Sequence, residues 1–168
     1  MKQSSKLIFF AVMCIALVAA LIIYVSLSGK ENPRAESPVR ISEIMDSNKG
    51  SVPDENGEYY DWVELYNSSA EAVDISGYGL SDNITGGVKF VFPQGTKLEA
   101  SGRIVVWCAG GEHEGGLYAP FSLSAGESVI LYNSTGGTID SVMTKSVEKG
   151  NTYALGQNGL WSEMRPSP

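Results

Sequence analysis

The residues best suited to chemistry lie in one polar stretch, 46–61, which is rich in carboxylate and amide side chains. Calcium prefers such oxygen ligands and takes about six to eight of them. The side chains that could supply them are Asp46, Asn48, Asp54, Glu55, Asn56, Glu58 and Asp61. The standard calcium loop does not fit, because Gly57 at its sixth position would put Val63 where the template requires glutamate. Two interpretations stay open: a solvated loop between two strands, or a weak, non-standard calcium site at Asp46, Asp54, Asn56, Glu58 and Asp61.

A second group of candidate residues is aromatic and begins where this stretch ends. Alternation along 61–67 places Trp62, Glu64 and Tyr66 on the face opposite Val63 and Leu65. If the two aliphatic residues face a core, the other face could present a platform to a sugar or a protein partner. The candidate ligand-binding residues are Tyr59, Tyr60, Trp62, Glu64 and Tyr66. The alternative is that Trp62 packs beneath the 46–60 loop.

No set of residues for catalysis is apparent. His113 is the only histidine and lies in the glycine-rich stretch 110–116, which we interpret as an exposed loop. A serine triad needs a positioned histidine, and one histidine between two glutamates is a poor metal site without further ligands. Cys108 has no base nearby and is expected to be a buried apolar residue. We therefore expect no enzyme activity and no cofactor, calcium excepted.

The first segment has the composition of a membrane anchor. Residues 7–27 contain no charge and 20 apolar residues in 21 positions. As a helix this segment would be about 31 Å long, close to the hydrocarbon thickness of a bilayer. The residues that define its two apolar ends are Leu7, Ile8, Phe9, Phe10, Leu21, Ile22 and Ile23. Length favours an uncleaved signal-anchor; the alternative is a signal peptide cut near Ser26-Leu27-Ser28, which would release the rest into the medium.

The flanking charges decide the orientation only weakly. Lys2 and Lys6 precede the apolar run, and Lys30, Arg34 and Arg40 follow it, so the positive-inside comparison is close to a tie. The short N-terminal tail favours a single-pass protein with its domain outside the cytoplasm. From Lys30 onward, ten basic and nineteen acidic residues give a net charge of −9, which excludes nucleic acid as the expected partner.

The rest of the chain predicts a domain of short strands. Alternating or apolar runs occur at 39–45, 61–67, 72–75, 88–92, 103–108, 128–133, 138–143, 151–155 and 160–161, with turn residues between them. No stretch of ten residues after the apolar segment has helical spacing. We therefore predict an all-β, antiparallel sandwich preceded by one transmembrane helix. The expected organisation is a tail at 1–6, an anchor at 7–28, a Pro-containing polar linker at 29–38 and the sandwich domain at 39–168.

An ordered series of segments resembles the lamin tail domain. The segments are 42–45 (SEIM), 61–67 (DWVELYN), 73–82 (VDISGYGLSD), 90–93 (FVFP), 98–102 (LEASG), 104–107 (IVVW) and 126–136 (GESVILYNSTG). The resemblance implies an immunoglobulin-like β-sandwich and supplies no catalytic residues. Lamins carry a long coiled-coil rod, whereas this chain has an apolar segment in its place. The resemblance is therefore closer to the membrane-attached proteins of bacterial envelopes that carry this domain.

These features favour a non-catalytic interaction module, anchored in the cell membrane, that binds an envelope protein or polysaccharide. One alternative is a membrane-tethered structural scaffold on the cytoplasmic side. Another is an accessory domain of a larger envelope hydrolase or kinase-like protein, because Arg165-Pro166-Ser167-Pro168 is typical of a linker.

Overall fold

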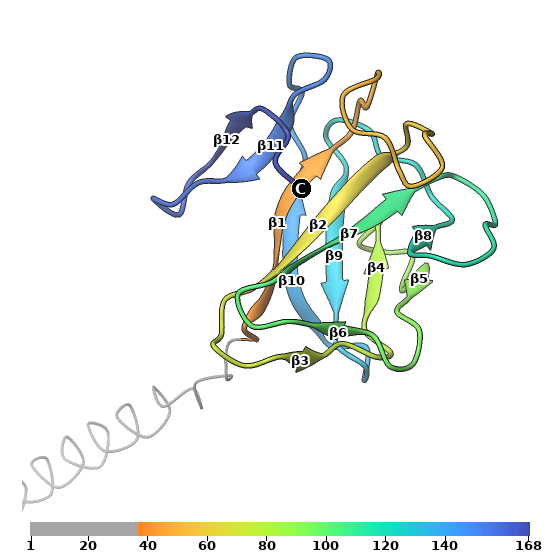
Figure 1. The fold of residues 1–168 in the computed structure, drawn as a ribbon, viewed down its shortest axis with the longest axis vertical. Helices are drawn as coiled ribbons and strands as arrows, with labels where there is room; N and C mark the ends of the chain where they lie inside the picture. The colour runs from red at the N-terminus through yellow and green to blue at the C-terminus, as the bar shows by residue number, and fades with distance from the viewer. Residues whose placement is uncertain (1–36) are drawn as a thin grey trace, which may run out of the picture. The chain divides into compact units, whose positions relative to one another are not determined.

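The computed structural model describes residues 37–168, which form one compact unit made of β-strands and the loops that join them (Figure 1). No part of this range is helical, as the sequence predicts. Within it there is consequently no helix that could cross a membrane. The predicted anchor, with Leu7, Ile8, Phe9, Phe10, Leu21, Ile22 and Ile23, and most of the predicted linker lie outside the described residues.

The strands form two larger sheets and one small one. The six-stranded sheet contains, in spatial order, β12 (Trp161–Met164), β11 (Thr152–Leu155), β1 (Val39–Met45), β2 (Asp61–Asn67), β7 (Arg103–Cys108) and β8 (Tyr118–Ala119). The four-stranded sheet contains β10 (Thr138–Met143), β9 (Ser128–Tyr132), β4 (Gly79–Ser81) and β5 (Phe90–Val91). Strands β3 (Val73–Asp74) and β6 (Lys97–Leu98) pair with each other. This arrangement confirms the predicted β-sandwich.

The core lies between the two larger sheets and follows the predicted alternation. Val63 and Leu65 of β2 face it and are fully buried. The core side chains of the six-stranded sheet are Val39, Ile41, Ile44, Val63, Leu65, Val106 and Cys108, and those facing them include Leu80, Phe90, Val129, Leu131 and Val142. Burial of this apolar surface is the main stabilising contribution to the fold. Cys108 is a free, buried thiol, as predicted.

A β-bulge in β1 controls which of its side chains face outward. The register with β2 shifts between Ile41 and Glu43, so Ile41 and Ile44 both face the core although three positions separate them. The extra residue, Ser42, and its neighbour Glu43 are left on the outer side of the sheet. At the same place the Ile41 N–H donates to an Asp140 carboxylate oxygen at 2.9 Å. Asp140 belongs to β10, an edge strand of the four-stranded sheet, so this bond joins β1 to the other sheet.

Four details differ from the sequence prediction. Strand β8 pairs with β7 in parallel, so the six-stranded sheet is not purely antiparallel. The short strands β4, β6 and β8 were not predicted, because two or three residues carry no measurable periodicity. Val88, which begins the run predicted at 88–92, lies before β5 and is 41% exposed. Residues 165–168 do not behave as a free linker, because Ser167 makes two hydrogen bonds to β1.

Candidate functional site

The outer face of the six-stranded sheet carries three rows of side chains that run across β1, β2 and β7. The register places Arg40, Tyr66 and Arg103 in the first row, Glu43, Glu64 and Val105 in the second, and Met45, Trp62 and Trp107 in the third. In the first row the two guanidinium groups lie over the Tyr66 ring, at 5.4 Å for Arg40 and 4.7 Å for Arg103. The second row brings two carboxylates side by side, although such pairs repel each other when both are charged.

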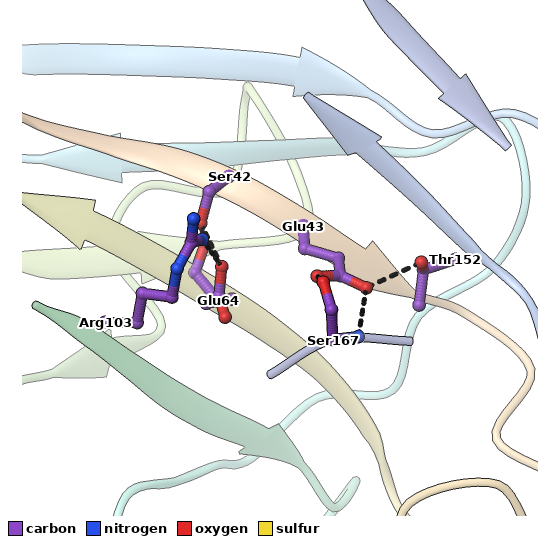
Figure 2. Close-up of polar contacts among 6 residues, drawn as sticks. All are labelled: Ser42, Glu43, Glu64, Arg103, Thr152 and Ser167. Carbon is purple, nitrogen blue, oxygen red and sulfur yellow. Dashed lines mark hydrogen bonds and ion pairs between the residues drawn. The ribbon is translucent and has the colours of Figure 1, made fainter. Parts of the chain in front are cut away.

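Glu64 is fully buried and is held by two neighbours (Figure 2). Its Oε1 accepts hydrogen bonds from the Ser42 hydroxyl and from Arg103 Nη1, both at 2.5 Å. Its Oε2 is also buried and has no partner among residues 37–168. Burial raises the pKa of this carboxyl, and the bonds from Ser42 and Arg103 partly oppose that change. The charged form is therefore only partly compensated.

Glu43 is held by a different set of donors, which come from far along the chain. Its Oε1 accepts bonds from the Thr152 hydroxyl at 2.7 Å and the Ser167 N–H at 3.0 Å, and its Oε2 accepts one from the Ser167 hydroxyl at 2.9 Å. Figure 2 shows Thr152 and Ser167 on one side of Glu43, and Ser42 and Arg103 on the side of Glu64. Glu43 and Glu64 are adjacent, but each has its own donors.

This outer face does not form the predicted aromatic platform. Trp62 and Glu64 are fully buried, so neither presents a surface to a ligand. Tyr66 is half-buried between the two arginines. The alternation that predicted the face was right, but it does not report that other parts of the chain cover it. The Glu64 carboxylate is buried and bonded within the sheet, so it is not exposed to a ligand.

The tip of the 46–60 loop is a turn organised by Asp54. One carboxylate oxygen of Asp54 accepts the N–H groups of Asn56 at 2.9 Å and Glu58 at 2.8 Å, and the other accepts the Tyr118 hydroxyl at 2.8 Å. Asp54 is buried, whereas Asn56 and Glu58 are exposed. The bonds to this carboxylate keep its pKa below the usual value in spite of its burial.

The other two residues of the predicted calcium set lie at the base of the loop. Asp61 accepts a hydrogen bond from the Asn48 N–H at 3.0 Å. Asp46 lies close enough for the negative charge of Asp61 to disfavour ionisation of its carboxyl. Burial raises the pKa of both carboxyls. The five predicted ligands thus divide into a tip group and a base group. Across residues 37–168, no three His, Cys, Asp or Glu side chains are grouped so that they could hold a metal ion. Calcium binding stays a prediction.

An exposed cluster of rings joins the 46–60 loop to the 109–117 loop. His113 stacks on Tyr118 with ring centroids 4.9 Å apart, and Tyr60 meets both rings edge-on, at 5.2 Å and 6.1 Å. Tyr60 and Tyr118 are half-buried and His113 is exposed. We call these three residues the aromatic patch. Tyr59, also in the predicted set, is 48% exposed and adjoins the patch in sequence.

The aromatic patch rests on the Asp54 turn through the Tyr118 hydroxyl. Besides its bond to Asp54, this hydroxyl accepts a long bond from the Asn56 amide, at 3.4 Å. Burial and the adjacent Asp54 carboxylate raise the pKa of Tyr118 to about 12, so the ring stays neutral at ordinary pH. Sequence reasoning found Tyr60 but missed His113 and Tyr118 as its partners. The one signal in the sequence that could have indicated Tyr118 is its position close after the glycine-rich stretch 110–116.

Four exposed glutamates lie in the two loops that carry the aromatic patch. Glu55 lies close enough to Tyr118 to disfavour ionisation of its hydroxyl, and Glu58 closes the Asp54 turn. Glu112 and Glu114 flank His113 in sequence. None of the four forms a salt bridge with any residue between 37 and 168. We call Glu55, Glu58, Glu112 and Glu114 the acidic rim.

Comparison with protein families gives one match. A family model described as Lamin Tail Domain matches residues 32–146, more than half of the chain. The match covers β1 to β10 and both loops of the aromatic patch, and it ends before the hairpin of β11 and β12. No curated protein matches the chain.

Proposed function

Because this chain belongs to the lamin tail domain family, we propose that it is a non-catalytic binding module held at the cell membrane. In this proposal the apolar segment 7–27 is the anchor, and the β-sandwich faces away from the cytoplasm. The domain binds an envelope protein or polysaccharide through the aromatic patch. The immunoglobulin-like fold of the family is a scaffold on which binding residues are carried by loops, and it brings no catalytic residues of its own.

The observation that carries the proposal is the contrast between the two polar regions of the domain. The carboxylates on the outer face of the six-stranded sheet are buried and bonded to the domain itself. The aromatic patch instead brings together an exposed imidazole ring and two half-buried tyrosines, on two loops that also carry exposed glutamates. Tyrosine is enriched at the energetically important positions of interfaces, because a large rigid ring buries area with little loss of entropy.

Protease shaving of intact cells tests the location. A tag placed after Pro168 is followed in membrane and medium fractions, together with a surface protein known to be cut. We expect the tag in the membrane fraction and its loss on shaving. Protection of the tag while the control is cut would contradict the outward orientation and favour the cytoplasmic scaffold. Release of the tag into the medium would contradict the anchor.

Site-specific photo-crosslinking in intact cells tests binding through the aromatic patch. A photoreactive phenylalanine analogue replaces Tyr59, which is aromatic, exposed and next to Tyr60. The matched control replaces Val91, which is 58% exposed on β5 of the other sheet. We expect a discrete adduct at position 59 and none at position 91. Equal labelling at both positions, or none at position 59, would contradict this use of the patch.

A further inference from the structure

We propose that the aromatic patch and its acidic rim bind an extended protein segment rich in lysine and arginine. This inference rests on the proposed function and narrows it, since it names the chemistry of the partner. It follows from the charges at the site, from the geometry of the rings, and from the hydrogen bonds that the site has already used.

The charges around the aromatic patch favour a cationic ligand. Glu55 and Glu58 come from the loop that leads to Tyr60, and Glu112 and Glu114 flank His113 in the other loop, so both loops of the patch carry negative charge. All four carboxylates are exposed and none is neutralised by a salt bridge within residues 37–168. The charge on the two loops therefore complements a cationic ligand. Interfaces of this kind speed association and select partners by charge.

The rings supply the second component of cation recognition. Aromatic faces attract ammonium and guanidinium groups through their quadrupole, and the attraction is strongest where the cation is partly desolvated. His113 stacks on Tyr118 and is exposed, so an aromatic ring is open to solvent here, with Glu112 and Glu114 next to it in the chain. A lysine or arginine side chain can lay its apolar stem on that ring while its charged end reaches a glutamate.

The hydrogen bonding of the site favours a peptide over a sugar. Sugar recognition needs directional donors and acceptors for hydroxyl groups beside a flat ring. The Asp54 carboxylate is already occupied by the Asn56 and Glu58 N–H groups and by the Tyr118 hydroxyl. What remains free is charge on exposed glutamates, which matches the point charges of basic side chains.

Titration of the full chain in non-ionic detergent with short labelled peptides tests the inference. The probes alternate serine with lysine, with arginine or with glutamate, and fluorescence anisotropy reports binding at low and at physiological ionic strength. A soluble oligomer of glucosamine, which is cationic and lacks a peptide backbone, is the competing probe. We expect the lysine and arginine peptides to bind, the glutamate peptide not to bind, and the affinity to fall with salt.

The variants separate a site from general attraction to an acidic domain. We expect the double substitution E112Q/E114Q to weaken binding of the basic peptides by about three- to tenfold. The substitution H113A should weaken it by about two- to fivefold, since it removes one ring face. The matched control E71Q/E99Q changes the net charge by the same amount but lies at the opposite end of β2, where the Asn67 amide donates to the backbone carbonyls of Glu71 and Glu99. This control should leave the affinity for the basic peptides unchanged.

Each outcome decides a separate question. Equal effects of E112Q/E114Q and E71Q/E99Q, or no binding of the basic peptides, would overturn the inference. Binding of the glucosamine oligomer through the patch in preference to the peptides would overturn the choice of a protein segment. If crosslinked adducts form at position 59 in cells while the basic peptides fail to bind, the proposed function stands and only the chemistry of the partner is wrong.

Discussion

Replacing Arg103 by methionine should destabilise the domain, because within residues 37–168 Arg103 is the one cation that pairs with the buried Glu64 carboxylate. Methionine keeps an unbranched apolar stem over the sheet and removes the guanidinium. Glu64 would then retain the Ser42 hydroxyl on Oε1, while Oε2 has no partner within 37–168 even in the unaltered protein. The variant therefore isolates the contribution of one charge pair on the outer face of the sheet.

The structure sets the size of the effect. Removing one member of a buried pair costs about 3–5 kcal/mol when the remaining charge stays dry. The Arg103 side chain is 49% exposed, so water can reach the place it leaves and lower this figure. The variant also loses the contact of the guanidinium with the Tyr66 ring, which is worth about 0.5–1 kcal/mol. We expect a loss of about 2–4 kcal/mol in the free energy of unfolding at neutral pH.

The effect should depend on pH with a definite sign. The pKa of Glu64 is raised above its ordinary value of 4.5, so the folded protein holds this proton more tightly than the unfolded chain does. Its contribution to stability is therefore greatest below pH 4.5 and falls as the pH rises through the folded pKa. Loss of Arg103 raises that pKa further. The deficit of R103M relative to the parent should therefore be smallest near pH 4.5 and grow toward neutral pH.

Urea denaturation of the full chain in mild detergent, followed by tryptophan fluorescence, measures these differences. The control E64Q keeps an acceptor for Ser42 and Arg103 without the buried charge, and should stay within about 1 kcal/mol of the parent. The double variant R103M/E64Q should be more stable than R103M at neutral pH, and its deficit should not change with pH. A deficit of R103M that is independent of pH, or one that E64Q does not relieve, would refute the reasoning.

Substitutions at three further residues, Asp140, Asn67 and Tyr118, test other contacts. The variant D140A should lower the free energy of unfolding by about 1–2 kcal/mol in urea, since the Ile41 N–H loses its acceptor, and D140N should lower it less. Asn67 is buried and its amide donates to three backbone carbonyls. The substitution N67D points a carboxylate oxygen at these carbonyls. It should lower the free energy of unfolding by about 2–4 kcal/mol in the same assay, at least as much as N67A does. In Y118F the ultraviolet titration should lose the phenol with a pKa of about 12. Because this pKa is raised in the folded protein, Tyr118 contributes its full stabilisation up to pH 10 and loses it as the pH rises toward 12. The free energy of unfolding of Y118F should therefore fall less between pH 10 and 12 than that of the parent. Stability profiles of Y118F and the parent that run parallel above pH 10 would contradict that role.

The longer strands could be predicted from the sequence because burial on one face repeats every second residue. This is why 61–67, 103–108 and 138–143 are predicted with the bounds that the structure has. Val88 lies before β5 although the alternation predicts it in that strand, because alternation does not show where strand pairing begins. The bulge in β1 cannot be predicted either, since neither Ser42 nor Glu43 is a glycine, the residue that marks one common type of bulge. Yet that bulge decides that Glu43 faces outward beside Glu64.

The candidate site was predicted less well, for a different physical reason. Alternation states which face of β2 a side chain occupies, but it does not state what lies over that face. The sequence therefore leaves open whether Trp62 lies on a ligand-binding face or packs beneath the 46–60 loop, and the structure shows that Trp62 and Glu64 are both buried. The partners that matter most are distant in sequence: Tyr118 meets Asp54 from 64 positions away, and Ser167 meets Glu43 from 124. No local pattern encodes such pairings, so they come only from the folded domain.

The pairing of β1 with β11 has a consequence for how the domain acquires its structure. Strand β1 leaves the ribosome first, but the Thr152 hydroxyl that bonds Glu43 follows 109 residues later. Before that hydroxyl is available, β1, β2 and β7 can pair, while the other edge of β1 stays open and the Glu43 carboxylate stays solvated. Contacts so far apart raise the contact order and slow folding. Closure of the sheet by β11 is therefore a late step in folding, and until it occurs the open edge of β1 can pair with another chain.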